Sequence, residues 1–289
     1  MSEVKNYGKS IRARLLNVAK QEDVFYQTIQ TRYFQERLLY RISQTHYRVN
    51  FYLKGGALMY AYERFAARPT LDIDFLSTHI SNDSKRIAEA FREICTVECK
   101  EDGVTFDSDR ITAQNITEFK DYHGVRLNIP VTMDTISQVM TMDVGFGDVV
   151  TPHPVVLDYP LLLEGLPEAS ILAYSIETVI AEKMHAIIDL ADQSSRMKDY
   201  YDIHHLLTSF KYNNAILQEA INRTFENRHT IYSADTMFFR KDFPDHPQMQ
   251  VRWTSFLRKS TISGSLSFSE VARWLQDALK PYWESYGRV

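Results

Sequence analysis

Two aspartates, Asp72 and Asp74, carry the strongest chemical signal in this sequence. In a strand they lie on one face, about 7 Å apart, and Leu71, Ile73 and Phe75 lie on the other, which can be buried. Mg²⁺ prefers one or two carboxylates plus substrate phosphates, and two such ions can hold both oxygens of a phosphoryl transfer. The pair therefore predicts metal-dependent phosphoryl chemistry, although an exposed acidic strand face has the same short pattern.

A Gly-Gly pair precedes the aspartates. Residues 51–53 are typical of the end of an apolar strand and residues 57–62 of a helix, so Gly55 and Gly56 lie at the junction. Bare backbone N–H groups and the helix dipole can receive phosphate at such a turn. Strand, Gly-Gly turn, helix and a strand with two aspartates, in this order, predict a nucleoside triphosphate site.

Two later helices carry charged residues on their apolar faces. Lys183 lies within the apolar stripe of a helix over about 175–191, so its charge must extend to solvent or meet an anion. In the next helix Arg196 and Asp199 lie on the apolar side, with Asp202 at its edge. Two compatible interpretations are a buried ion-pair network and a triphosphate site formed by Lys183 and Arg196, with Asp199 orienting Lys183.

Histidines add no metal site to these helices. His204 and His205 are adjacent on a helix and diverge by about 100°, so they cannot easily share an ion. His185 lies opposite the apolar stripe and is expected to be solvated. Lys54, just before the Gly-Gly pair, is interpreted as an exposed strand residue.

This set of motifs resembles the AbiEii nucleotidyltransferase-like toxins, whose relatives include the MenT toxins, within the DNA polymerase β-like nucleotidyltransferase superfamily. The resemblance extends over roughly residues 8 to 210. It implies an α/β (α+β) fold with a polymerase β-like core, a mixed sheet, N-terminal helices and a helical C-terminal region. The matching segments are the GG-x-L turn at 55–58, the R-x-[ST]-x-D-x-D-[FL] run at 68–75, and the runs at 34–41, 181–183 and 196–202.

The resemblance also implies roles for individual residues. It places Lys183 and Asp199 in the active site. With the patterns above, the residues expected at the nucleotide are Gly55, Gly56, Arg68, Thr70, Lys183 and Arg196. Such enzymes use a third acidic residue on a neighbouring strand, to bind metal or to act as general base on the acceptor hydroxyl. Asp143 is the preferred residue because it lies inside an alternating strand. Asp134 and Asp148, nearer to turns, are the rivals.

The predicted reaction transfers a nucleoside monophosphate from an NTP to an acceptor hydroxyl, with two Mg²⁺ ions and release of pyrophosphate. What the resemblance implies further is a bacterial toxin acting on the 3′ end of tRNA, which would block translation. It also implies a cognate antitoxin and a toxin–antitoxin or phage-defence system. Two alternatives stay open: transfer to a protein or small molecule, and a non-catalytic nucleotide-binding module.

Length and composition bound these expectations. The chain has 289 residues, enough for one large or two modest domains, and a net charge of −4, so any contact with nucleic acid must use a local basic surface. The two cysteines are expected to be reduced thiols. No apolar run approaches the ~20 residues that span a membrane, and the N-terminus lacks an apolar signal core. We therefore expect a cytoplasmic protein without membrane contact.

Two regions are predicted. Residues 1–150 form the nucleotidyltransferase core, with a helical lead-in over 8–45, a helix over 82–99 and strands over 104–150. Residues 151–289 form a mainly helical region that contributes Lys183, Arg196 and Asp199 to the site, and the proline-rich segment 151–170 is interpreted as a connection. Aromatic and basic residues alternate within 211–289, which suits RNA stacking, but an ordinary amphipathic helical domain is favoured.

Overall fold

The computed structural model describes residues 6–119, 122–260, 262 and 266–288, and these divide between two compact units. The sheet unit comprises residues 1–147 and 155–173, and the helical unit comprises residues 148–154 and 174–289. The sheet unit therefore includes 155–173, which the predicted boundary at residue 150 assigns to the C-terminal region.

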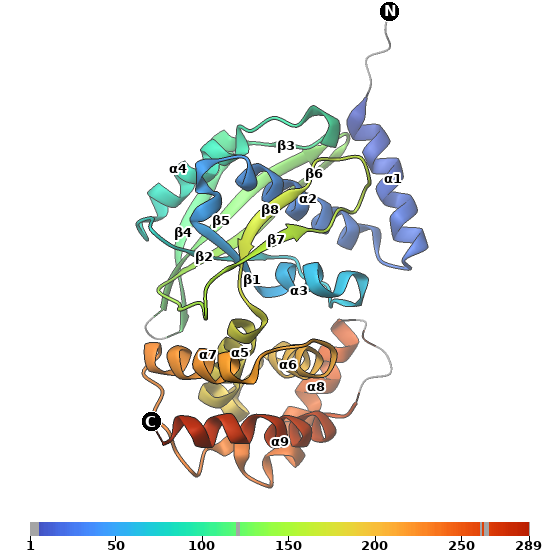
Figure 1. Cartoon of the computed structure of the whole chain (residues 1–289). Coiled ribbons are helices and arrows are strands. Elements are labelled where there is room, and N and C mark those ends of the chain that lie inside the picture. Colours follow the sequence, from blue (N-terminus) through green and yellow to red (C-terminus); the bar gives the residue numbers. More distant parts are fainter. Residues whose placement is uncertain (1–5, 120–121, 261, 263–265, 289) are drawn as a thin grey trace, which may run out of the picture. The chain divides into compact units, whose positions relative to one another are not determined.

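The elements of each unit are labelled in Figure 1. The sheet unit contains helices α1 (Tyr7–Gln21), α2 (Tyr26–Ser43), α3 (Gly55–Glu63) and α4 (Ser84–Cys95), and strands β1 (Phe51–Lys54), β2 (Ile73–Ser77), β3 (Thr105–Phe106), β4 (Thr112–Phe119), β5 (Tyr122–Met133), β6 (Ile136–Phe146), β7 (Val155–Tyr159) and β8 (Ala169–Ala173). The helical unit contains α5 (Ile176–Leu190), α6 (Met197–Ser209), α7 (Asn214–Asn227), α8 (Pro247–Lys259) and α9 (Phe268–Tyr286). The predicted α/β class, with N-terminal helices and a helical C-terminal region, is confirmed.

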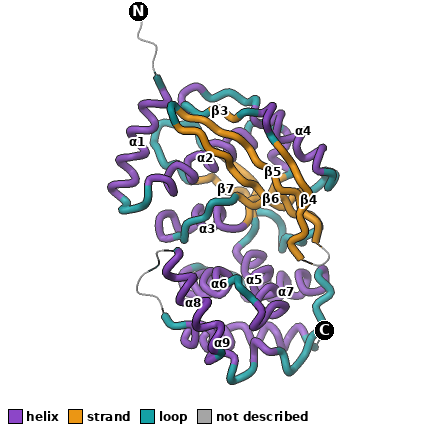
Figure 2. The backbone as a smooth tube through the Cα atoms, turned by 180° about the vertical axis from the view of Figure 1, so that it is seen from behind, coloured by secondary structure: helices purple, strands orange, loops and turns teal. Residues whose placement is uncertain are grey.

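The strands form one mixed sheet in the order β3-β5-β6-β2-β1-β8-β7, and β4 also pairs with β5. The pairs β1–β8 and β2–β6 are parallel, whereas the other pairs are antiparallel. Figure 2 shows these strands as one continuous layer. The central strands bury alternate apolar residues such as Phe75, Leu127 and Met142, which fixes which face each strand turns to the core.

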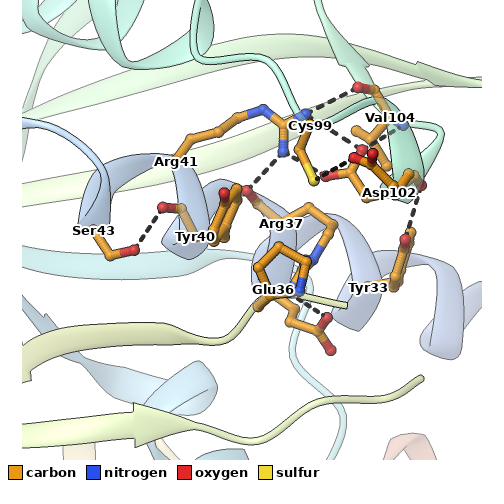
Figure 3. Close-up of polar contacts among 11 residues, drawn as sticks. Tyr33, Glu36, Arg37, Tyr40, Arg41, Ser43, Cys99, Asp102 and Val104 are labelled. Atoms are coloured by element: carbon orange, nitrogen blue, oxygen red, sulfur yellow. Dashed lines mark hydrogen bonds and ion pairs between the residues drawn. The ribbon is translucent and has the colours of Figure 1, made fainter. Parts of the chain in front are cut away.

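Helix α2 carries charged residues that are buried within the sheet unit (Figure 3). The Arg41 guanidinium donates to the Asp102 carboxylate over 2.8 Å and to the Val104 carbonyl over 3.0 Å. The Tyr33 hydroxyl donates to the Asp102 carbonyl over 2.8 Å. These bonds satisfy polar groups that would be costly to bury unpaired. They connect α2, which includes the run 34–41, with the segment before β3.

A second buried pair on α2 holds the chain between β7 and β8. Glu36 forms an ion pair with Arg37 at 2.8 Å and accepts from the Leu162 N–H over 2.6 Å. Arg37 donates to the Pro167 carbonyl over 3.0 Å. Burial raises the pKa of Glu36 to about 7, although Arg37 opposes the shift.

The interpretation of 151–170 as a connection is wrong. Strand β7 occupies 155–159, and β8 pairs in parallel with β1, with Tyr52 opposite Leu172. The Tyr159 hydroxyl, fully buried, donates to the Ala57 carbonyl over 3.2 Å. Prolines at 154 and 160 lie immediately outside β7. This is a place where proline is tolerated, since β7 is an edge strand and proline cannot donate a hydrogen bond within a sheet. The prolines therefore delimit a strand.

The core of the helical unit is rich in aromatic rings, including several that the sequence places beside basic residues. Phe238 is fully buried, and the buried Trp253 donates its indole N–H to the Leu266 carbonyl over 2.9 Å. Arg252 donates to the Ser194 carbonyl over 3.2 Å. Buried rings cannot stack on bases, so these observations favour the amphipathic helical domain. Among the described residues, no helix has both the length and the apolar character that crossing a membrane requires.

Candidate functional site

The Gly-Gly junction is built as the sequence predicts: β1 ends at Lys54 and α3 begins at Gly55. Gly55 has φ +68°, a left-handed conformation that favours glycine. A Cβ atom added at Gly55 would lie 1.9 Å from Oδ2 of Asp74. The Asp74 carboxylate therefore lies directly against the turn, and no larger residue fits at position 55 without displacing it.

Gly56 is constrained by a different neighbour. A Cβ atom added there would lie 2.6 Å from Oγ1 of Thr70, whose hydroxyl donates to the Asp72 carbonyl over 3.2 Å. Arg68 lies in the same loop and is half-buried. The structure thus brings the Gly-Gly turn together with Thr70 and Asp74, which follow it in the sequence by 14 to 19 residues.

Strand β2 begins at Ile73, later than the alternating pattern predicts. Leu71 is 70% exposed, so its predicted place on the buried face is wrong, and Asp72 lies just before the strand. The reason is a contact with α2: the Gln35 side-chain amide donates to the Leu71 and Asp72 carbonyls over 3.3 and 3.2 Å. Asp74 itself lies in β2, between the buried Ile73 and Phe75.

Four charged residues form a row across adjacent strands. Lys54 on β1 is paired with Asp74 on β2, Asp74 with Asp143 on β6, and Asp143 with Arg126 on β5. Residues paired across neighbouring strands project to the same face of a sheet. The row therefore places two carboxylates side by side, about 4.8 Å apart at the backbone, with one cation at each end.

Asp143 is held by Arg126. The Arg126 Nε donates to Asp143 Oδ1 and its Nη2 to Oδ2, each over 2.7 Å, which is a bidentate pair. The Asp143 side chain is 10% exposed and that of Arg126 39% exposed. Arg126 was not predicted as a site residue from the sequence. Its place in an alternating strand was visible, but its position opposite Asp143 depends on the register of β5 with β6.

The two rival acids lie elsewhere. Asp134 has φ +53°, lies between β5 and β6, and pairs with Arg12 at 3.0 Å. Asp148 belongs to the helical unit and pairs with Arg228 at 2.8 Å. Of the three acids considered, Asp143 is the one in register with Asp74.

The carboxylates beside the Gly-Gly turn are oxygen donors of the kind that a divalent metal takes. Within the part of the chain that the structure describes, no group of three His, Cys, Asp or Glu residues is arranged to hold an ion. Asp72 and Asp74 match the one or two carboxylates that Mg²⁺ takes beside phosphate oxygens. Asp143 shares a face with Asp74, but both of its oxygens accept from Arg126 in this arrangement.

Lys183, in α5 of the helical unit, lies in a buried ion-pair network, as one interpretation of the sequence predicts. Its Nζ donates to Asp199 over 2.9 Å and to Asp202 over 2.7 Å. Arg196, immediately before α6, donates from Nε to the other oxygen of Asp199 over 2.6 Å. Burial alone would raise the pKa of Asp199, but Lys183 and Arg196 together lower it well below its usual range.

A second polar network in the helical unit was not found from the sequence. Arg228 pairs with Asp148 at 2.8 Å and with Glu182 at 3.2 Å, and Tyr174 donates to Glu182 over 3.0 Å. His185 is buried beside Arg228, so its predicted solvation is wrong. Burial, with a further contribution from Arg228, lowers the pKa of His185 to about 4, so the imidazole is neutral.

The sheet, with its Gly-Gly junction and carboxylate row, has a mixed α/β architecture that is consistent with a nucleotidyltransferase-like core. A sequence profile of the AbiEii nucleotidyl transferase toxin family, of type IV toxin–antitoxin systems, matches residues 37–285. The chain belongs to this family. It is thus a nucleotidyltransferase toxin of the type IV class.

Two crystal structures from Helicobacter pylori are similar to the chain. JHP933 shares 15% sequence identity and a TM-score of 0.50, with 91% of this chain and 94% of that chain covered. A putative nucleotidyltransferase shares 15% identity with a TM-score of 0.49, covering 91% and 97% of the two chains. At this identity the likeness to JHP933 concerns the fold alone. No curated protein matches the chain.

Proposed function

We propose that this protein transfers a nucleoside monophosphate from an NTP to an acceptor hydroxyl and releases pyrophosphate, with two Mg²⁺ ions as cofactors. The observation that carries the proposal is the contact of the Asp74 carboxylate with the Gly55 turn, in register with Asp143. A carboxylate that can bind metal, beside a turn that can receive phosphate, is an arrangement suited to nucleotide chemistry.

The residues of the sheet unit have separate roles in this proposal. Asp72 and Asp74 hold the metal ions, which supply charge neutralisation at the phosphates. The backbone N–H groups of Gly55 and Gly56 receive phosphate oxygens, and Arg68 and Thr70 contribute further donors. Asp143, beside Asp74, is the third metal ligand or the general base for the acceptor hydroxyl. Its release from Arg126 must precede either role.

In the helical unit, Lys183 and Arg196 are proposed to neutralise triphosphate charge, with Asp199 orienting both. Asp199 binds both cations at once, one on each carboxylate oxygen, which supports an orienting role. The Arg196 side chain is 39% exposed, so part of its guanidinium can meet a ligand. Asp199 and Asp202 both accept from Lys183, which fixes the position of its charge.

We further propose that the acceptor is the 3′ end of tRNA and that its extension blocks translation in the cytoplasm. The support is membership of a type IV toxin family. The same membership supports a cognate antitoxin protein as partner and a role in phage defence. Because the chain carries a net charge of −4, contact with RNA must use local basic groups.

The test is incubation of the full-length protein with total bacterial tRNA, Mg²⁺ and each labelled NTP in turn. Asp74→Asn removes one metal-binding charge, and Asp109→Asn removes an exposed carboxylate of the same unit as a matched control. We expect label on tRNA with the natural chain and the control, and none with Asp74→Asn. Label on a protein or small molecule alone would reject the tRNA acceptor, and no label on any acceptor would reject the transferase proposal.

A further inference from the structure

The charges in the row across the sheet are arranged in the order cation, anion, anion, cation. Asp74 and Asp143 are directly paired on parallel strands, and like charges placed side by side in a sheet destabilise it. Lys54 and Arg126 lie at the two ends. A Cβ atom added at Gly145 would lie 3.7 Å from Lys54 Nζ, so the lysine extends across the sheet toward β6.

Arg126 and a divalent cation would compete for the same carboxylate. The guanidinium donates to both oxygens of Asp143 over 2.7 Å, the oxygens through which Asp143 would bind a metal beside Asp74. Arg126 is the more exposed member, at 39% against 10% for the Asp143 side chain. The Arg126 side chain is therefore the partner that can move away to bind a ligand, while the Asp143 carboxylate keeps its place on β6.

We propose that Arg126 is a positioning residue that binds the Asp143 carboxylate in the nucleotide-free protein. When NTP binds, the Arg126 guanidinium leaves Asp143 and binds a phosphate group of the nucleotide. Asp143 is then released to join Asp74 as a metal ligand. Guanidinium binds phosphate in the same bidentate geometry as carboxylate, so the exchange conserves the hydrogen bonds of Arg126. This inference rests on the proposed function and adds an order of binding to it: the nucleotide binds first, and its binding completes the metal site.

The first measurement is the affinity of the full-length, nucleotide-free protein for Mn²⁺, with electron paramagnetic resonance as the readout of binding. Arg126→Ala frees Asp143, so Mn²⁺ binding tightens by about fivefold or more, the effect of releasing one half-exposed ion pair. Arg126→Lys keeps the charge but loses the planar fork, so binding tightens less. Arg86→Ala, which breaks an exposed ion pair on α4, is the matched control and leaves Mn²⁺ affinity unchanged.

The second measurement is NTP binding in the presence of EDTA, where no metal contributes. Arg126→Ala weakens it, whereas Asp143→Asn, which releases Arg126 for phosphate, strengthens it. Unchanged or weaker Mn²⁺ binding in Arg126→Ala would overturn the proposal. So would a gain in Mn²⁺ affinity that persists in Arg126→Ala combined with Asp143→Asn. The transferase assay is separate: if it fails while these binding results hold, the proposed reaction falls and the exchange at Asp143 stands.

Discussion

The carboxylate row of the sheet unit and the Lys183 network of the helical unit use the same residue types in opposite ways. In the Lys183 network two aspartates meet two cations, and Asp199 is 1% exposed, so its charges are compensated within the protein. In the row, two carboxylates are neighbours on parallel strands, and the cation that holds Asp143 is 39% exposed. The first arrangement fixes a structure, whereas the second is suited to exchanging partners.

This difference predicts that removing charge mainly affects activity in the carboxylate row and mainly affects stability in the Lys183 network. The largest effect is expected for Asp74→Asn, which should lower nucleotide transfer on the order of 10³-fold or more, about 4 kcal/mol or more. Its free energy of unfolding should stay constant or rise, because repulsion with Asp143 is relieved. Transfer rates and urea unfolding curves, measured on the same preparation, check both parts. A large loss of stability would contradict the assignment of Asp74 to a ligand-exchanging site.

Lys183→Met should show the opposite pattern at the level of folding. It leaves Asp199 and Asp202 buried without their shared cation, and breaking a buried ion pair costs about 3–5 kcal/mol. Urea unfolding measures the loss. Lys280→Met, which removes one member of an exposed pair with Glu284, is the control and should cost less than about 0.5 kcal/mol. Equal effects of the two substitutions would show that burial does not set the strength of the network.

The pH dependence of stability should also differ between the units. The pKa of Glu36 is raised by burial to about 7, so the folded protein binds this proton more tightly than the unfolded chain does. Its contribution is complete below the unfolded pKa of about 4.5 and is lost as pH rises through 7, by about 3 kcal/mol. The pKa of Asp199 is lowered, so its contribution is present above about pH 4 and is lost on further acidification.

Unfolding measured from pH 2 to 8 separates these two slopes. Glu36→Gln should remove the decline between pH 4.5 and 7 and leave the acid limb intact. Asp199→Asn should remove the loss of stability in acid and keep the decline between pH 4.5 and 7. It should also lower the free energy of unfolding at neutral pH. If Glu36→Gln leaves the decline between pH 4.5 and 7 unchanged, the buried carboxyl does not titrate there.

The sequence predicted those features that depend on short segments. The Gly-Gly junction, the helix after it and the charged stripe around Lys183 all follow from spacing within about twenty residues. Leu71 was misplaced because the Gln35 side chain, more than thirty residues away, binds the carbonyls that a strand would use. His185 was misplaced because α7 and Arg228 cover a face of α5 that the pattern of α5 alone presents as polar.

The site depends on register, which local patterns do not contain. Asp143 was chosen over Asp134 and Asp148 from alternation alone, and its pairing with Asp74 comes from the parallel contact of β2 with β6. The pairing of Arg126 with Asp143 requires the β5–β6 register as well. The predicted roles of these residues in metal binding stay predictions, because they concern a ligand-bound state.

Two glycines of the sheet unit share a left-handed backbone, but only one of them lies against Asp74. Gly55→Ala strains a backbone with φ +68° and forces the Asp74 carboxylate to move, whereas Gly165→Ala strains φ +84° with nothing within 4 Å. Each should lose about 1–2 kcal/mol of stability from backbone strain. Only Gly55→Ala should also lose nucleotide transfer and Mn²⁺ affinity, because only there does the new methyl group meet the carboxylate that we propose binds metal. Matching losses of transfer in both variants would mean that strain alone limits activity, and that the contact between the Gly-Gly turn and Asp74 has no specific part in the site.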